Sequence, residues 1–162
     1  MRAATRHSKV SLDIFRIVHF SIQHDHVHLM IEASSKAALA RGMKGLACRL
    51  AKTLNRTAGR RGKVLRDRYH ARPLTTPLEV RNCLRYVLQN AAKHAEADPM
   101  PDLPAIVVDG IDPWSSATWF NGWQHPPPPA LDSPVAPPQT WLMHFGWKRH
   151  GLLRCGEIPA GA

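Results

Sequence analysis

The chain has 162 residues, a formal net charge of +10 and a pI near 10.3, and 44% of its residues are hydrophobic. This length suits one domain with a hydrophobic core, and the composition is that of a folded soluble protein rather than a disordered one. No apolar run is long enough to span a membrane, and the N-terminal residues lack the apolar stretch of a secretion signal. A strongly basic protein attracts polyanions, most simply nucleic acid.

Composition changes near residues 97 and 98. Residues 1–97 hold 19 Lys and Arg against 6 Asp and Glu, whereas residues 98–162 hold 3 against 6, together with 12 of the 14 prolines. We therefore predict a domain over residues 1–97 that carries the polyanion, followed by an irregular Pro/Trp-rich extension over residues 98–162. Four residues of the extension are expected to anchor it onto the domain, because exposed aromatic side chains in such number are unusual; they are Trp141, Leu142, Phe145 and Trp147.

The three cysteines are Cys48, Cys83 and Cys155, an odd number in no metal-binding spacing. They predict reduced thiols rather than a disulfide framework or a zinc site. We therefore expect a cytoplasmic protein, associated with the nucleoid if its polyanion is DNA.

Local patterns predict strands and helices in alternation. Residues 15–22 and 26–33 are rich in β-branched and aromatic residues on either side of a short polar turn, which predicts a hairpin. Residues 36–57 follow a possible Ser34-Ser35 cap and have apolar residues at spacings of three and four, which predicts a helix. Residues 64–74 are expected to form a third strand, limited by Pro73.

A second helix is predicted to begin at Thr76-Pro77-Leu78-Glu79. This segment has the spacing of a capping box, with proline at the first helical position. The helix is expected to run to about His94, with an apolar stripe facing the sheet; the stripe consists of Val80, Leu84, Val87, Leu88 and Ala91.

His26 and His28 are the most informative residues of the second strand. Side chains alternate along a strand, so both imidazoles lie on one face, opposite Val27 and Leu29. Two such imidazoles can converge on one divalent cation. The alternative is a pair of half-exposed histidines on a solvated face.

Tyr86 lies off the apolar stripe of the second predicted helix, and Asn90 follows it one turn later on the same polar face. A tyrosine near a basic surface can attack phosphorus if a metal polarises the phosphate. An ordinary surface tyrosine is the alternative. Tyr69, the other tyrosine of the chain, is predicted to lie in the third strand, where packing or stacking on DNA suits it better.

Basic side chains are concentrated in the first helix and in the segment that follows it. They are expected to contact the phosphates of a folded single strand, and about six such contacts would make binding steeply salt dependent. The predicted DNA-binding residues are Arg41, Lys44, Arg49, Lys52, Arg56, Arg60, Arg61, Lys63, Arg66, Arg68 and Arg72.

Three segments together resemble the IS200-like transposases, and especially their REP-associated bacterial relatives, which belong to the HUH endonucleases. The segments are Phe20-Ser21-Ile22-Gln23-His24-Asp25-His26-Val27-His28-Leu29-Met30-Ile31-Glu32-Ala33, Asp67-Arg68-Tyr69-His70 and Leu84-Arg85-Tyr86-Val87-Leu88-Gln89-Asn90-Ala91. The resemblance covers roughly residues 14–95. It implies an α+β fold with a ferredoxin-like antiparallel sheet, helices on one face, and a histidine pair beneath a tyrosine helix.

By this resemblance Tyr86 is the nucleophile, and its attack on a DNA phosphate leaves a 5′-phosphotyrosine and a free 3′-OH. His26 and His28 would be ligands of Mg²⁺ or Mn²⁺, with Asn90 in the place of a polar third ligand. The implied partner is single-stranded or hairpin DNA, and the resemblance is compatible with both a monomer and a homodimer.

Two other functions remain open at the level of sequence. Relatives usually have a further strand and helix before the segment that corresponds to Phe15, so the first strand is expected to be missing here. Either the start codon is placed too far downstream, or the chain is a truncated, inactive relic that only binds nucleic acid. The ten histidines are also compatible with a structural metal-binding protein.

Overall fold

The histidine-rich hairpin forms as predicted. Strand β1 spans Phe15–Ile22 and strand β2 spans Val27–Ala33, and the two make a two-stranded antiparallel sheet. The Gln23 N–H donates to the His26 carbonyl at 2.9 Å and closes the turn between them. The computed structural model describes residues 14–23, 25–89, 111–128 and 132–157.

Helix α1 spans Lys36–Thr57, the range predicted from the apolar spacing. Ser35 is its N-cap, and the Ser35 side chain accepts a hydrogen bond from the Ala38 N–H. The Phe15 ring lies directly against the backbone of Gly42, where any larger residue would clash with it. Further along the helix, the apolar stripe becomes exposed at Leu50 and Leu54.

The predicted third strand over residues 64–74 is wrong. The described chain contains no strand between α1 and the next helix, and nearly every residue from 58 to 76 is exposed. A strand needs a neighbouring edge for its backbone hydrogen bonds, and within the described residues β2 pairs only with β1. Tyr69 consequently lies in an irregular, exposed segment rather than in a strand.

Helix α2 spans Pro77–Leu88 and begins as predicted. Thr76 is the N-cap, and the full capping box with Glu79 is present. The helix ends at Leu88 rather than near His94, since the next residue, Gln89, already has the non-helical backbone of a C-cap. Four of the five predicted stripe residues are buried, and Ala91 lies outside the described residues.

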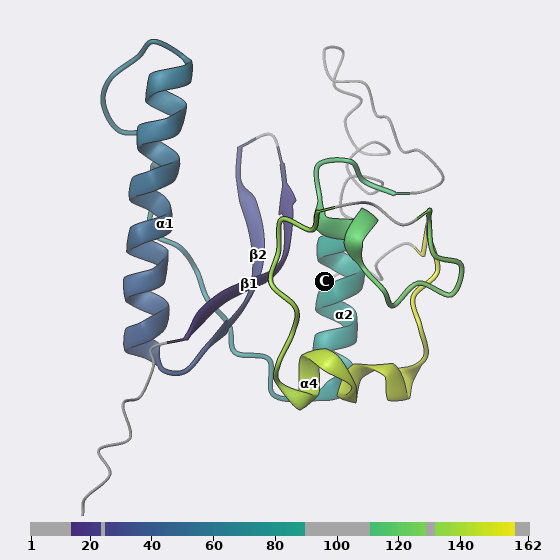
Figure 1. Cartoon of the computed structure of the whole chain (residues 1–162). Helices are drawn as coiled ribbons and strands as arrows, with labels where there is room; N and C mark the ends of the chain where they lie inside the picture. Colours follow the sequence, from purple (N-terminus) through teal and green to yellow (C-terminus); the bar gives the residue numbers. More distant parts are fainter. Residues whose placement is uncertain (1–13, 24, 90–110, 129–131, 158–162) are drawn as a thin grey trace, which may run out of the picture. The chain divides into compact units, whose positions relative to one another are not determined.

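The described residues from 111 to 157, here called the C-terminal segment, fold around α2 (Figure 1). They contain the 3-10 helix η1 at Ser116–Trp119, the short helix α4 at Trp141–His144 and the 3-10 helix η2 at Gly146–His150. The buried stripe of α2 packs with Met30 of β2 and with six residues of this segment; these are Ile111, Ala117, Phe120, Trp123, Trp147 and Leu153.

Of the predicted aromatic anchors, only some are buried. Trp147 is 1% exposed, and Leu142 packs against the core cluster while remaining partly exposed. Trp141 and Phe145 are 50% and 56% exposed, so the prediction that they anchor the extension is wrong. Trp147 and Leu153 fill the available core, which leaves these two rings on the surface.

The C-terminal segment also pairs with β1 on the side that β2 leaves free. Ser21 and Ser115 form an antiparallel bridge, and the Ile22 N–H donates to the Trp114 carbonyl at 2.8 Å. Buried Asp112 accepts a hydrogen bond from the Ser21 hydroxyl at 3.2 Å. The edge of β1 is therefore covered by the chain itself, as isolated strand edges in soluble proteins usually are.

The chain divides into two compact units, Met1–Phe15 with Ala33–Tyr69 and Arg16–Glu32 with His70–Ala162. We call the first the α1 unit and the second the sheet unit. The fold class is α+β, as predicted. The predicted domain boundary at residues 97 and 98 lies outside the described residues and stays a prediction. No helix in the described part of the chain is long and apolar enough to cross a membrane.

Candidate active site

The histidine pair lies at the turn end of β2. His26 immediately precedes the strand and His28 is its second residue. The Nε2 atoms of the two imidazoles are 3.0 Å apart, and the ring centroids are 4.6 Å apart with the planes at 83°. Asp25 contacts the other ring nitrogen of His26, with Oδ1 2.6 Å from Nδ1. This contact fixes the ring so that Nε2 is turned toward His28.

Tyr86 is brought to this pair by the packing of α2. The Tyr86 ring is 5.0 Å from the His28 ring, centroid to centroid, in an edge-on arrangement. Tyr86 is half-buried and packs against the core cluster, so it is not an ordinary surface tyrosine. The apolar stripe of α2 faces mostly the C-terminal segment, which explains why a residue off that stripe can face the sheet.

The 3.0 Å between the two Nε2 atoms is a hydrogen-bond distance between the rings. It is also close to the spacing of two ligand atoms about 2.1 Å from one octahedral cation and at right angles around it. Among the described residues, neither this site nor any other has a group of three or more His, Cys, Asp or Glu side chains that could hold a metal ion. Asn90, the predicted third ligand, lies outside the described residues.

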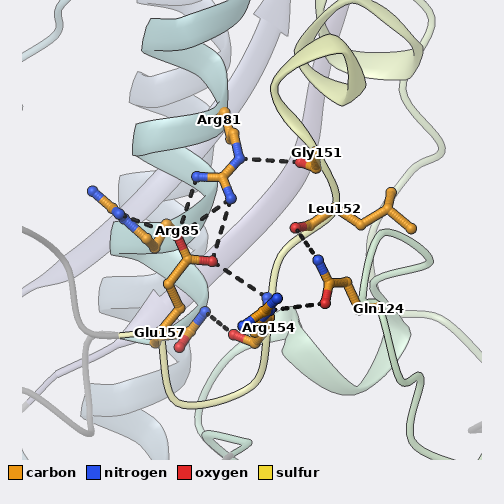
Figure 2. Close-up of polar contacts among 8 residues, drawn as sticks. Arg81, Arg85, Gln124, Gly151, Leu152, Arg154 and Glu157 are labelled. Carbon is orange, nitrogen blue, oxygen red and sulfur yellow. Dashed lines mark hydrogen bonds and ion pairs between the residues drawn. The ribbon is translucent and has the colours of Figure 1, made fainter.

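Charged contacts between α2 and the C-terminal segment fix the tyrosine helix, and sequence reasoning missed them. Figure 2 shows Arg81 and Arg85 pointing toward Glu157, and the Arg81 Nη1 and Arg85 Nη1 atoms both lie 3.2 Å from Glu157 Oε1. Arg81 Nε also donates to the Gly151 carbonyl at 3.0 Å. Burial alone would raise the pKa of Glu157, but hydrogen bonds from Arg81 and the Arg154 backbone, with the charge of Arg81, hold it below its ordinary value.

Gln89 connects the end of α2 to the same segment. Its side chain is 1% exposed and donates from Nε2 to the Arg154 carbonyl at 2.9 Å. Its spacing in the sequence places Gln89 on the polar face of the helix with Tyr86. The C-terminal segment covers that position, so Gln89 ties the end of the helix, one turn from Tyr86, to the backbone of Arg154, 65 residues away.

The predicted DNA-binding residues are all exposed. Ten of them lie in the α1 unit, five on α1 itself, and Arg72 lies in the sheet unit. On α1 the basic residues occupy the face opposite the apolar stripe. Arg72 lies 3.8 Å from the Glu79 carboxylate, a solvent-exposed pair that leaves the guanidinium accessible.

The three cysteines take no part in this site. Cys48, Cys83 and Cys155 form no disulfide in this structure. Burial raises the pKa of the Cys83 thiol on α2 to about 11, although the charge of Arg72 works the other way. Cys83 is therefore a packing residue rather than a second nucleophile next to Tyr86.

A basic α+β protein in which a histidine pair faces a tyrosine on a separate helix has the features of a nucleic-acid strand-transfer protein. The family model described as "Transposase IS200 like" matches residues 7–90, just over half of the chain. The chain therefore belongs to the IS200-like transposase family. None of the curated proteins and none of the solved structures compared with the chain matches it.

Proposed function

We propose that this protein cleaves and rejoins single-stranded hairpin DNA through Tyr86, with a divalent cation held by His26 and His28. Membership in the transposase family assigns the chain broadly to DNA transposition. The observation that carries the finer proposal is the position of the Tyr86 ring, 5.0 Å from His28, whose Nε2 lies 3.0 Å from that of His26.

The chemistry requires little of the protein beyond placing these groups. The Tyr86 hydroxyl loses its proton to solvent and its oxygen attacks a DNA phosphorus. The bond from phosphorus to the 3′ oxygen breaks, and that oxygen takes up a proton from solvent. The products are a 5′-phosphotyrosine and a free 3′-OH. A 3′-OH attacking the phosphotyrosine restores a phosphodiester and releases Tyr86, so no nucleotide cofactor is consumed. Mg²⁺ or Mn²⁺, when bound, would polarise the scissile phosphate.

Asp25 and the C-terminal segment have positioning roles in this proposal. The contact of Asp25 Oδ1 with His26 Nδ1 leaves His26 Nε2 to act as a ligand, a common arrangement for histidines that bind metals. Asn90 is proposed as an additional ligand, four residues after Tyr86 in the sequence. The sheet unit brings Tyr86 and both histidines together within one chain, which supports activity as a monomer.

The exposed basic side chains are proposed to bind the phosphates of the DNA. Phosphate contacts release counterions, so affinity for single strands should fall steeply with salt. Charge alone would also allow a binding module without catalysis. The closeness of Tyr86 to His28 favours the enzyme, because a binding module has no need of this arrangement.

The test is covalent capture on a denaturing gel. Labelled single-stranded hairpin DNA is incubated with Mn²⁺ and wild-type protein, Tyr86→Phe, His26→Ala or the matched control Tyr69→Phe. We expect a protein–DNA band with wild type and Tyr69→Phe, and none with the other two or in the presence of EDTA. A band that persists in Tyr86→Phe would refute the assignment of the nucleophile. Retained DNA binding with no band in any variant would favour the binding module.

A further inference from the structure

Two large aromatic side chains of the C-terminal segment lie largely on the surface. Trp141 and Phe145 are 50% and 56% exposed, while Trp147 beside them is 1% exposed and supplies the anchor to the core. Exposed aromatic residues grouped on one short stretch usually mark a binding surface. Trp141 begins α4 and Phe145 directly follows it, so both project from the same turn of chain.

Cationic groups surround these two rings. Arg149 Cζ lies 4.9 Å from the centroid of the Trp141 ring, and Lys148 Nζ lies 5.8 Å from that of Phe145. His144 stacks on Phe145 with the centroids 4.0 Å apart and the planes at 15°. The sequence has no Asp or Glu between Asp132 and Glu157. We call these five residues the aromatic platform: Trp141, His144, Phe145, Lys148 and Arg149.

The platform is held rigidly. The buried carboxylate of Glu32 in β2 accepts hydrogen bonds from the Gln139 N–H at 2.9 Å, the Thr140 N–H at 2.8 Å and the Thr140 hydroxyl at 2.7 Å. Burial by itself would raise the pKa of Glu32, but these bonds, with one from Arg16, hold it below its ordinary value. The Trp141 ring rests on Gly146, where a Cβ would come within 2.7 Å of it. A surface fixed in this way loses little entropy when it binds a ligand.

We propose that the aromatic platform binds single-stranded DNA, with unpaired bases packed against the exposed parts of the Trp141 and Phe145 rings and phosphates held by Lys148 and Arg149. Aromatic rings interleaved with cations are the usual means of binding single strands, because every base has a face that can stack and every nucleotide has a phosphate. Bases in a duplex already stack on each other, so the platform should prefer single strands. The positive charge of the platform complements a nucleic acid. It disfavours binding of a protein partner that is basic or has few acidic residues.

The location of the platform gives it a use in the proposed reaction. Arg81 bonds to the Gly151 carbonyl, so the end of η2 lies beside the first half of α2, whereas Tyr86 lies in the second half. A single strand bound at the platform would therefore lie close to the helix that carries Tyr86. In this respect the inference rests on the proposed function, since it makes the platform an additional contact for the same DNA.

The test compares affinities for a fluorescent 20-nucleotide oligo-dT and a 20-base-pair duplex, by anisotropy, in the Tyr86→Phe background, where the proposed function predicts no cleavage. Replacing both rings with apolar side chains (Trp141→Leu with Phe145→Leu) should weaken binding of oligo-dT about tenfold to a hundredfold, as expected for the loss of one or two stacked bases. The matched control keeps both rings (Trp141→Phe with Phe145→Tyr) and should stay within about twofold. Duplex affinity should change little in either.

A second variant pair removes charge instead of rings and does not depend on the first. Lys148→Gln with Arg149→Gln should reduce the slope of log affinity against log salt for oligo-dT by about one. Equal oligo-dT affinities in the leucine and aromatic variants, together with an unchanged salt slope, would overturn the platform. A ring-dependent affinity in a protein that never forms the covalent band would refute the proposed cleavage and leave the platform standing.

Discussion

The stability of the sheet unit should depend on pH through His19 in β1. His19 is 7% exposed, its Nδ1 lies 3.1 Å from the Ser116 hydroxyl oxygen, and its ring meets Phe120 edge-on at 5.3 Å. Burial lowers the pKa of His19 from 6.5 to about 4. Between these two values the unfolded chain binds a proton at this site and the folded chain does not. Acid therefore favours the unfolded chain, and stability is lost as pH falls from 6.5 toward 4.

The size of this effect follows from the pKa difference. Each unit corresponds to roughly 1.4 kcal/mol, so the free energy of unfolding should drop by about 2 kcal/mol between pH 7.5 and pH 5 and by about 3 kcal/mol at pH 4. Burial raises the pKa of nearby Asp112, despite hydrogen bonds from Trp114 and Ser21. The raised pKa of Asp112 has the opposite effect on stability. At this group acid favours the folded chain, because the folded chain takes up a proton more readily than the unfolded chain.

Urea denaturation followed by tryptophan fluorescence at pH 5 to 8 measures the effect, with His19→Gln as the matched variant. Glutamine stays neutral over this range, and its amide is able to bond to Ser116. Asp112 and the exposed histidines contribute equally to both proteins, so the difference between the two pH profiles isolates His19. We expect the wild type to lose about 2 kcal/mol more than the variant between pH 7.5 and 5. Parallel profiles would refute the reasoning that His19 is buried in its neutral form.

Three further predictions concern the C-terminal segment and the basic surface. Glu157→Gln should destabilise the protein by about 2 kcal/mol, because Arg81 and Arg85 lose a charged acceptor. It should also lower the yield of covalent adduct per folded molecule. An unchanged urea midpoint would contradict the expected loss of stability. Gly122→Ala should lower the free energy of unfolding by about 1–3 kcal/mol, since its Cβ would meet the rings of Phe120 and Trp147. By contrast, a Cβ at Gly45 in α1 meets nothing, so Gly45→Ala should be neutral or slightly stabilising. Equal thermal shifts in the two variants would show that the contact at Gly122 is unimportant. Lys52→Gln with Arg56→Gln should weaken hairpin binding and lower its salt slope by about one to two; a constant slope would remove this face of α1 from the DNA interface.

The parts of the fold that were predicted correctly depend on local signals. The bounds of β1 and α1 and the start of α2 follow from apolar spacing, from the Ser35 cap and from the Thr76–Glu79 capping box. Tyr86 was singled out because it lies off the apolar stripe. The sequence could identify these features because each is decided by residues within a few positions of one another.

The failures all depend on distant residues. Residues 64–74 have strand-like composition, but a strand also requires a partner edge, which composition cannot supply. Gln89 lies on the polar face of α2 by its spacing, yet it is buried under a segment 65 residues away, and the Arg81–Glu157 contact spans 76 residues. One feature of the sequence could have suggested the contact with Glu157. Arg81 and Arg85 are one turn apart on α2, and Glu157 is the last acidic residue of the chain.

The match to the transposase family ends at residue 90, yet the residues that hold the tyrosine helix come mostly from beyond it. Six of the eleven buried residues in the core cluster around α2 belong to the C-terminal segment. Leu84 and Leu88 are fully buried because Trp147 and Leu153 are there to cover them. The family region thus supplies the histidines and the tyrosine, whereas the distance between Tyr86 and His28 depends on packing against a segment outside that region. Changes in the C-terminal segment should therefore alter the proposed chemistry without touching Tyr86 or the histidines.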